Sequence, residues 1–168
     1  MLFVKTIGEE FLPTRSTFMA LIHPGYYNRM SWVYPYERNK QSKAYIPPYR
    51  GHYVYYMGSL NGGTSEAFVN FAESCSQRVH DDYDKGIVAC FHDESHLNYY
   101  IREVNGEGLS PIYGCPEGAH NSSEAKIIIR DKVKVDSYFG KGHSFTKGEK
   151  IATALKRVWR AIRWYLYI

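Results

Sequence analysis

The chain has 168 residues, 44% of them hydrophobic and 23% charged, and a formal net charge of +4 at pH 7. This composition is that of one globular domain with its own core, and no run approaches the roughly 18 consecutive apolar residues of a membrane span. The excess positive charge lies in residues 151–168, which hold four basic residues and no acid, so residues 1–150 are formally neutral and broad nucleic-acid binding by them is excluded.

The first third of the chain alternates apolar segments with a long loop. Residues 17–22 are apolar enough for a strand, which Pro24-Gly25 would end. A polar and aromatic loop is predicted over residues 26–49, where three prolines interrupt any regular element. A second strand is predicted over residues 53–60.

A helix and further strands follow. Thr64 is the predicted N-cap of a helix whose apolar residues recur at helical spacing: Phe68, Phe71, Ala72, Cys75 and Val79. Residues 86–91 are predicted to form a short buried strand, and two more strands are predicted over residues 126–130 and 132–135. This order of elements predicts a mixed α/β domain.

The segment FHDESHLN, residues 91–98, concentrates chemically active side chains. Two histidines four residues apart suggest a metal site, but in the zinc-protease motif a glutamate directly follows the first histidine, and here Asp93 takes that place. No third ligand stands at a telling spacing downstream. We therefore predict no metal ligands here, and a helix with Asp93 as its N-cap and an inward face of Leu97, Tyr100 and Ile101.

Glu94 would project from the first turn of that helix, where the positive end of the helix dipole stabilises a carboxylate anion. Such a position suits a nucleophile or a charge stabiliser better than a general acid. An ordinary helix cap followed by a first-turn acid would have the same spacing, so the residues alone leave both interpretations open.

Residues 151–168 are predicted to form a basic amphipathic helix, because five apolar residues recur at steps of three and four: Ile151, Leu155, Val158, Ile162 and Leu166. A basic helix with tryptophan and tyrosine can lie in the headgroup region of an anionic bilayer, or it can dock on its own domain with its basic side chains in water. We expect contact with a membrane surface, because the segment has no acids.

Five motifs, in order and approximate spacing, resemble glycosyltransferase family 6, which includes the blood-group A and B transferases and the α-1,3-galactosyltransferase. They are HPGYY (residues 23–27), YER with QSKAYIP (36–38 and 41–47), YYMGSLNGGT (55–64), HDESHLN (92–98) and LSPIY (109–113). The resemblance covers about residues 1–148. The extension beyond residue 150 makes the chain similar to a bacterial type of the family.

The resemblance implies the C-terminal part of a GT-A fold, the Rossmann-like fold of nucleotide-diphospho-sugar transferases, with a mixed sheet over residues 1–148 and a helical tail over residues 149–168. It implies a retaining hexosyltransferase that moves galactose or N-acetylgalactosamine from a UDP-sugar to the 3-hydroxyl of a β-galactoside, in some members a fucosylated one. A non-catalytic, membrane-associated, carbohydrate-binding remnant is the alternative.

The resemblance also implies roles for single residues. Glu94 corresponds to the catalytic carboxylate, either a nucleophile or the group that stabilises an oxocarbenium-like transition state. Asp93 corresponds to a donor-sugar contact, and Met57 and Ser59 flank the glycine at which the family selects its donor. Met57 resembles the galactose-selecting type and Gly25 the N-acetylgalactosamine type, and we expect galactose.

The acceptor contacts that the resemblance implies are His23, Phe91, Glu94 and Glu117. Phe91 stands where vertebrate members have tryptophan, and Glu117 would replace an aspartate. Lys141 and Lys147 fall where the family has a basic pair that offsets the charge of the UDP diphosphate. The same segment also has the composition of a Gly-rich linker, and that alternative stays open.

Residues 1–10 resemble the part of the family sequence that follows the Asp-x-Asp motif for Mn²⁺ and UDP. We therefore expect no cofactor in this chain, Mn²⁺ as a candidate cofactor of a full-length form, and little sugar transfer by these 168 residues alone. Bacterial members can carry Asn-x-Asn and work without metal. We expect the protein at the cytoplasmic face of a bacterial inner membrane.

Overall fold

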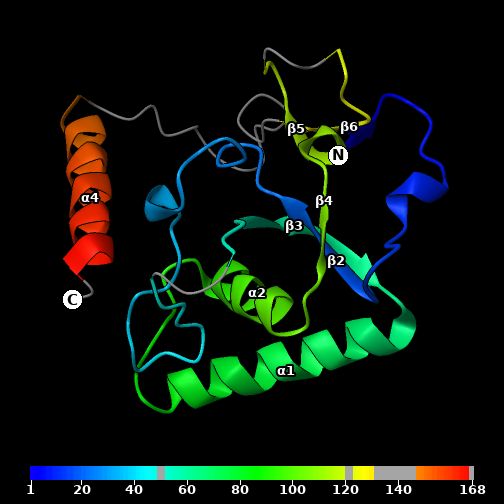
Figure 1. The fold of residues 1–168 in the computed structure, drawn as a ribbon. Helices are drawn as coiled ribbons and strands as arrows, with labels where there is room; N and C mark the ends of the chain where they lie inside the picture. The colour runs from blue at the N-terminus through cyan, green and yellow to red at the C-terminus, as the bar shows by residue number, and fades with distance from the viewer. Residues whose placement is uncertain (49–51, 120–122, 131–146, 167–168) are drawn as a thin grey trace, which may run out of the picture.

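The computed structural model describes residues 1–48, 52–119, 123–130 and 147–166. Within these ranges it has two three-stranded mixed sheets and three α-helices (Figure 1), which confirms the prediction of a mixed α/β fold. The strand order is β3-β2-β4 in one sheet and β1-β6-β5 in the other.

The first sheet is built around β2 (Phe18–Ile22), which confirms the strand predicted over residues 17–22. It pairs antiparallel with β3 (Tyr56–Gly63) and parallel with β4 (Glu107–Leu109). Because side chains alternate across a strand, Phe18 and Ala20 enter one core cluster while Met19 and Leu21 enter another. This two-sided burial explains why the β2 sequence is an uninterrupted apolar run.

Two helices cover one face of this sheet, and Figure 1 shows α2 lying between α1 and the strands. Helix α1 (Ser65–Tyr83) begins after Thr64, whose hydroxyl oxygen accepts a hydrogen bond from the N–H of Ala67 (3.2 Å), so the predicted N-cap is confirmed. Helix α2 (His92–Glu103) buries the predicted inward face of Leu97, Tyr100 and Ile101 against the cluster around Phe18.

The second sheet consists of β1 (Leu2–Phe3), β6 (Ile127–Ile129) and β5 (Cys115–Pro116). Strand β6 confirms the strand predicted over residues 126–130. Ile127 of β6 packs with Leu109 and Tyr113, so this sheet closes the face of β2 that the helices do not cover. Three short 3₁₀ helices lie between strands: η1 (Glu9–Phe11), η2 (Ser31–Val33) and η3 (Pro111–Gly114).

The long loop predicted over residues 26–49 has no strand among its described residues, yet it contains a core of its own. Tyr34, Tyr36 and Ile46 are buried together with Tyr55, the residue before β3. The ring centroids of Tyr36 and Tyr55 lie 5.4 Å apart, within the range of favourable aromatic contacts. The loop is therefore packed against the start of β3.

The third helix, α4, spans Lys147–Leu166 and contacts η2 at one side of the molecule (Figure 1). Its described large apolar side chains are 40–64% exposed. Across the ranges that the structure describes, no helix has the length and apolarity needed to cross a membrane.

Two local predictions are wrong. Residues 86–91 form no strand, because their backbone groups bond elsewhere: the N–H of Ile87 donates to the carbonyl of Asp82 and that of Cys90 to the carboxylate of Glu37. Asp93 is not the N-cap of α2, since the cap is Phe91 and Asp93 lies in the first turn. The strand predicted over residues 132–135 lies outside the described residues.

Candidate functional site

Glu94 lies in the first turn of α2 and faces the strand β3. Its Oε1 atom accepts a hydrogen bond from the Tyr55 hydroxyl (2.7 Å), and its Oε2 atom accepts one from the backbone N–H of Gly58 (2.8 Å). Burial, followed by the hydrogen bond to Glu94, raises the pKa of Tyr55 above its ordinary value, so the phenol keeps its proton and donates. Both carboxylate oxygens therefore have fixed partners.

Gly58 brings the predicted donor-binding residues to this carboxylate. A Cβ atom at Gly58 would lie 3.5 Å from Oε2 of Glu94 and 3.7 Å from Oδ2 of Asp93. Both acids therefore lie against the backbone of β3 at the glycine between Met57 and Ser59. The structure thus brings Glu94 and Asp93 to the backbone between Met57 and Ser59, whereas the Met57 side chain packs with the cluster of Met19 and Leu21 on the other face of the sheet.

Asn98 joins α2 to β3 and so sets this geometry. It is 1% exposed, and its Oδ1 atom accepts from the N–H of Tyr56 (2.9 Å) while its Nδ2 atom donates to the carbonyl of the same residue (2.8 Å). Nδ2 also donates to the backbone carbonyl of Glu94 (2.8 Å). One side chain therefore holds the turn that carries Glu94 and the strand that carries Gly58.

The turn before α2 is held by a buried acid of the long loop. Oε2 of Glu37 accepts from the N–H of Cys90 (2.7 Å), and Oε1 accepts from the N–H of Asn39 (2.7 Å). The next N–H, of Phe91, donates to the hydroxyl of Ser95 (3.0 Å). The Ser95 bond satisfies a backbone N–H that the start of a helix leaves without a partner inside the helix, and the Glu37 bonds tie the long loop to the turn before it.

Tyr55, Glu37 and Asn98 were not assigned roles from the sequence. Each belongs to a motif quoted above, YYMGSLNGGT, YER or HDESHLN. Their presence in these motifs was the only available signal, because each has a partner 39–53 residues away in the chain.

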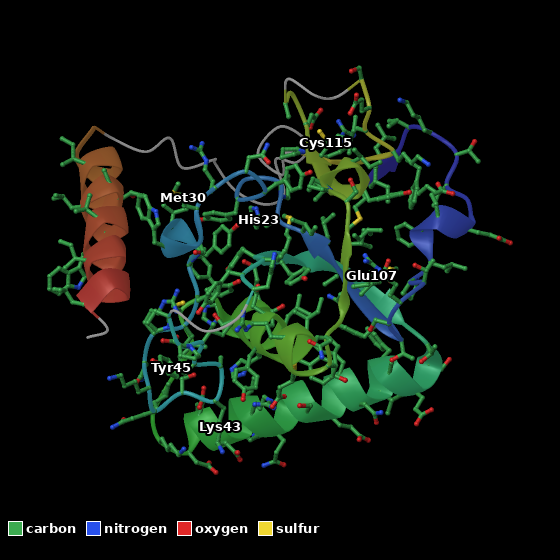
Figure 2. All side chains as sticks on the ribbon, viewed as in Figure 1. His23, Met30, Lys43, Tyr45, Glu107 and Cys115 are labelled. Atoms are coloured by element: carbon green, nitrogen blue, oxygen red, sulfur yellow. The ribbon has the colours of Figure 1, made fainter. Side chains whose placement is uncertain are left out.

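His23 follows the last residue of β2, close to the middle of the molecule in Figure 2. Its Nδ1 atom accepts from the N–H of Gly25 (3.0 Å), so the neutral ring carries its proton on Nε2 as a donor. Its ring centroid is 4.8 Å from that of Tyr26 and 5.7 Å from that of Tyr55, which also contacts Glu94. Burial lowers the pKa of His23, although the charge of Glu94 opposes the shift.

Of the other predicted acceptor contacts, Phe91 adjoins Glu94 at the start of α2, whereas Glu117 lies in the second sheet. Phe91 is 42% exposed and lines a pocket beside α4. Glu117 belongs to the second sheet, where its N–H donates to the carbonyl of Ile129 (3.0 Å) and its carboxylate lies 3.9 Å from the Arg130 guanidinium. Lys141 lies outside the described residues, and of Lys147 only the backbone, at the start of α4, is described.

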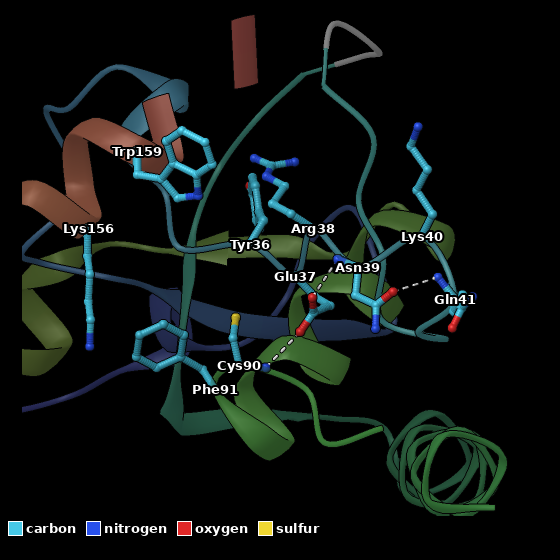
Figure 3. A pocket seen from close by; sticks show the side chains of 10 residues that line it. All are labelled: Tyr36, Glu37, Arg38, Asn39, Lys40, Gln41, Cys90, Phe91, Lys156 and Trp159. Atoms are coloured by element: carbon cyan, nitrogen blue, oxygen red, sulfur yellow. Dashed lines mark hydrogen bonds between the residues drawn. The ribbon is translucent and has the colours of Figure 1, made fainter. Parts of the chain in front are cut away.

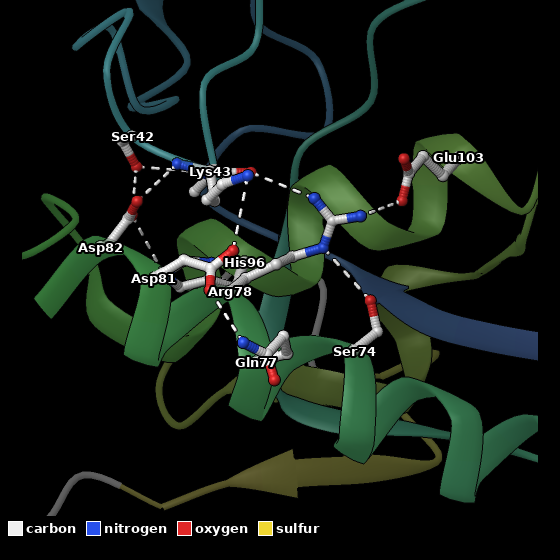
Figure 4. Close-up of polar contacts among 10 residues, drawn as sticks. Ser42, Lys43, Ser74, Gln77, Arg78, Asp81, Asp82, His96 and Glu103 are labelled. Carbon is white, nitrogen blue, oxygen red and sulfur yellow. Dashed lines mark hydrogen bonds and ion pairs between the residues drawn. The ribbon is translucent and has the colours of Figure 1, made fainter. Parts of the chain in front are cut away.

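The two histidines of FHDESHLN do not share a site. His92 is exposed, whereas His96 is buried with its Nε2 atom 3.8 Å from a carboxylate oxygen of Asp82, near the end of α1 (Figure 4). Asp82 also accepts from the Ser42 hydroxyl (2.6 Å) and the Lys43 N–H (2.7 Å). Among the residues with described positions, no three His, Cys, Asp or Glu side chains are grouped so as to hold a metal ion.

Comparison with known proteins gives one consistent result. A family model described as Glycosyltransferase family 6 matches residues 1–137. The O-antigen biosynthesis glycosyltransferase WbnI of Escherichia coli is 40% identical over 130 residues, which are 74% of this chain and 55% of WbnI.

Animal proteins match over a shorter stretch. The histo-blood group ABO system transferase 2 of Rattus norvegicus is 40% identical over 114 residues, which are 67% of this chain and 33% of that protein. The globoside alpha-1,3-N-acetylgalactosaminyltransferase 1 of Gallus gallus is 37% identical over 114 residues, 67% of this chain and 32% of the relative. The chain therefore spans about half of the length of WbnI and about a third of these animal relatives.

Proposed function

This chain belongs to glycosyltransferase family 6, and from that membership we propose that its protein is a retaining hexosyltransferase that moves a sugar from a UDP-sugar to the 3-hydroxyl of a β-galactoside. One observation carries the proposal. Glu94 presents a carboxylate held at both oxygens, beside Asp93 and against the glycine between Met57 and Ser59. A retaining transfer needs a covalent glycosyl-enzyme or shielding of one face of the sugar, and an anion beside the anomeric carbon can provide either.

In the proposed reaction the bond between the anomeric carbon and the UDP oxygen breaks, and its electron pair leaves with the diphosphate. Glu94 either forms a bond to the anomeric carbon or stabilises the positive charge on it without a bond. The acceptor 3-hydroxyl then attacks the face that UDP has left, so the configuration is retained. The hydroxyl proton passes to the diphosphate oxygen, which completes UDP and the new glycosidic bond.

The diphosphate charge is assigned in this proposal to Lys141 and Lys147, which lie near each other in sequence. No step is assigned to Mn²⁺, because the described part of the chain groups no three metal-ligating side chains. A metal ion bound elsewhere in a longer protein would offset the same charge.

For the donor we propose galactose. Met57 has the large side chain that the resemblance associates with a galactose donor. It stands one residue before the glycine that Asp93 and Glu94 approach, and its side chain packs with the cluster of Met19 and Leu21 on the other face of the sheet. A pocket discriminates weakly when substrates differ by one small group, so UDP-N-acetylgalactosamine should remain a slower donor.

For the acceptor we propose a galactoside-terminated glycan whose galactose contacts His23, Phe91 and Glu94. The neutral His23 ring would donate through Nε2 to a sugar hydroxyl. Phe91 offers a partly exposed aromatic face. Glu117 would contact more distant parts of the acceptor, since its contacts lie in the second sheet.

The test is transfer of radiolabelled galactose from UDP-galactose to a β-galactoside by the protein expressed from its complete gene. Glu94→Gln should lower turnover by about a hundredfold or more, because it removes the charge and keeps the shape. The matched control is Glu107→Gln, whose carboxylate is likewise held by hydrogen bonds, from the N–H groups of Thr14 and Arg15, but lies on β4. A wild type that binds galactosides without transferring sugar would instead support the carbohydrate-binding alternative.

We infer a second partner, the surface of an anionic membrane at the cytoplasmic face, for α4. Its large apolar side chains with described positions are exposed, and residues 151–168 carry basic residues without acids. Apolar insertion and attraction to anionic lipids would therefore act together. In a flotation experiment with liposomes that contain anionic lipid, the wild type should rise with the liposomes. A variant with Leu155→Glu and Ile162→Glu should stay in the bottom fraction. Equal flotation of both proteins would refute this inference.

A further inference from the structure

A pocket of about 680 Å³ lies between three segments that are far apart in the sequence (Figure 3). Its walls are residues 36–41 of the long loop, the turn at Cys90 and Phe91, and the side chains of Lys156 and Trp159 from α4. This volume lies within the range of about 300–1,000 Å³ that is usual for ligand-binding pockets. Neither the catalytic turn nor the family motifs account for the α4 wall.

The wall formed by residues 36–41 of the long loop is held in place by contacts within the protein. Both oxygens of Glu37 accept backbone hydrogen bonds, which ties the loop to the turn at Cys90. The Arg38 guanidinium lies over the ring of Tyr36 at 5.2 Å and donates to the carbonyl of Ile46. Burial lowers the pKa of Arg38 to about 10, so the group stays charged at neutral pH. A ligand would therefore meet a preorganised surface and would not have to order it.

The pocket combines aromatic faces with hydrogen-bonding groups. Phe91 is 42% exposed and Trp159 is 60% exposed, and Figure 3 shows them on the α4 side of the pocket with the loop opposite. Asn39, Gln41 and Lys156 add amide and ammonium groups to the lining. A sugar ring has an apolar C–H face and a rim of hydroxyls, and this lining offers a partner to each.

The pocket adjoins the catalytic turn through Phe91. The N–H of Glu94 donates to the carbonyl of Phe91 (3.0 Å), so one peptide segment forms both the pocket wall and the base of the carboxylate. A glycan whose terminal galactose reaches Glu94 would leave the site past Phe91. The next sugar residues would then meet Trp159.

We propose that this pocket binds the sugar residues that precede the terminal galactose of the acceptor glycan, with Trp159 as the residue that selects for acceptor length. This rests on the proposed function, because it assigns the terminal galactose to Glu94. Helix α4 would then have two uses: exposed apolar residues for a membrane, and Trp159 with Lys156 for the glycan.

The experiment titrates the full protein with methyl β-galactoside and with a galactose-terminated tetrasaccharide, and measures both dissociation constants by calorimetry or NMR. The tetrasaccharide should bind about tenfold more tightly than the methyl galactoside, and Trp159→Ala should remove most of that gain, by the usual magnitude of a stacking contact. Affinity for methyl β-galactoside should not change. The matched control is Leu155→Ala, an exposed residue of α4 that does not line the pocket.

The other possible results separate the pocket assignment from the acceptor assignment. Equal wild-type affinities for the two ligands, or equal tetrasaccharide affinities for Trp159→Ala and Leu155→Ala, would refute the pocket assignment and leave the proposed transferase intact. Failure of both ligands to bind the wild type would refute the acceptor assignment as well. Circular dichroism of both variants establishes that α4 is still helical.

Discussion

Asn98 bonds to Tyr56 as a neighbouring strand would, through one donor and one acceptor at the edge of β3. The same amide reaches the backbone of Glu94. Helix α2 is therefore aligned with the strand by a specific pairing in addition to apolar packing, and the distance between Glu94 and Gly58 follows from that pairing.

The first prediction tests this alignment with Asn98→Asp. The change keeps the shape but replaces two donated hydrogen bonds with a buried charge facing two carbonyl groups, so the free energy of unfolding should fall by about 3–5 kcal/mol. Asn70→Asp, an exposed change on α1, should alter it by no more than about 0.5 kcal/mol. Urea denaturation of both variants measures the difference, and equal losses would contradict the role given to Asn98.

The second prediction concerns the donor to Glu94. Tyr55→Phe removes one of two hydrogen bonds to the carboxylate, so kcat for transfer should fall by about 10- to 100-fold, with little change in KM for UDP-galactose. Tyr53→Phe is the matched control, because that hydroxyl donates to the carbonyl of Pro47 and not to the site. Steady-state kinetics with both variants decide the matter: if they behave alike, Tyr55 does not support catalysis.

The third prediction concerns the turn before α2. Glu37→Gln cannot accept both backbone hydrogen bonds, so the amides of Cys90 and Asn39 should exchange faster with solvent, and stability should fall by about 2 kcal/mol. In Glu107 one carboxylate oxygen accepts from both Thr14 and Arg15, so Glu107→Gln can keep both bonds through its amide oxygen and its effect should be smaller. Hydrogen exchange followed by NMR measures the amides directly. Unchanged protection at Cys90 would show that Glu37 does not hold the turn.

The fourth prediction concerns acid. Burial lowers the pKa of His96 in the folded protein, against opposing charges on Asp82, Glu37 and Asp93 and with help from Arg78. Below the ordinary value of 6.5 the unfolded chain binds more protons than the folded one, so the free energy of unfolding should fall as pH falls from there towards the folded pKa.

This acid effect has a variant test. His96→Gln should flatten the fall in stability between about pH 7 and about pH 5, whereas His92→Gln, at an exposed position, should not. His23 shifts in the same direction, so part of the slope should survive. Chemical denaturation across this pH range measures the slopes. An identical slope in the wild type and His96→Gln would rule out His96 as its source.

Elements with local signals were predictable from the sequence. The apolar run of β2, the Thr64 cap of α1 and the inward face of α2 each depend on neighbours in the chain, and each is present. Glu94 was found in the same way, as a first-turn acid in a motif that resembles a known family.

Features that depend on distant partners were not predictable. Residues 86–91 have the apolarity of a strand. The N–H of Cys90, however, donates to Glu37, which lies in a distant part of the chain, so residues 86–91 do not pair with another strand. Asp93 has the chemistry of an N-cap, yet Ser95, two residues further, binds the N–H that precedes the helix. At Cys90 a tertiary contact overrides a local preference, whereas at Asp93 one local cap replaces another, since Ser95 lies only four residues from Phe91.

The two hydrogen bonds to the Glu94 carboxylate have a consequence for the proposed reaction. Because Tyr55 and Gly58 hold both oxygens at the start of β3, a movement of the carboxylate towards the anomeric carbon of a donor would break at least one of these hydrogen bonds. In the proposed transfer the sugar would then be the moving part: it would travel from the leaving diphosphate to the acceptor while Glu94 stays in place. Structures trapped along the reaction coordinate should therefore superimpose at Glu94 and differ in the depth of the sugar ring.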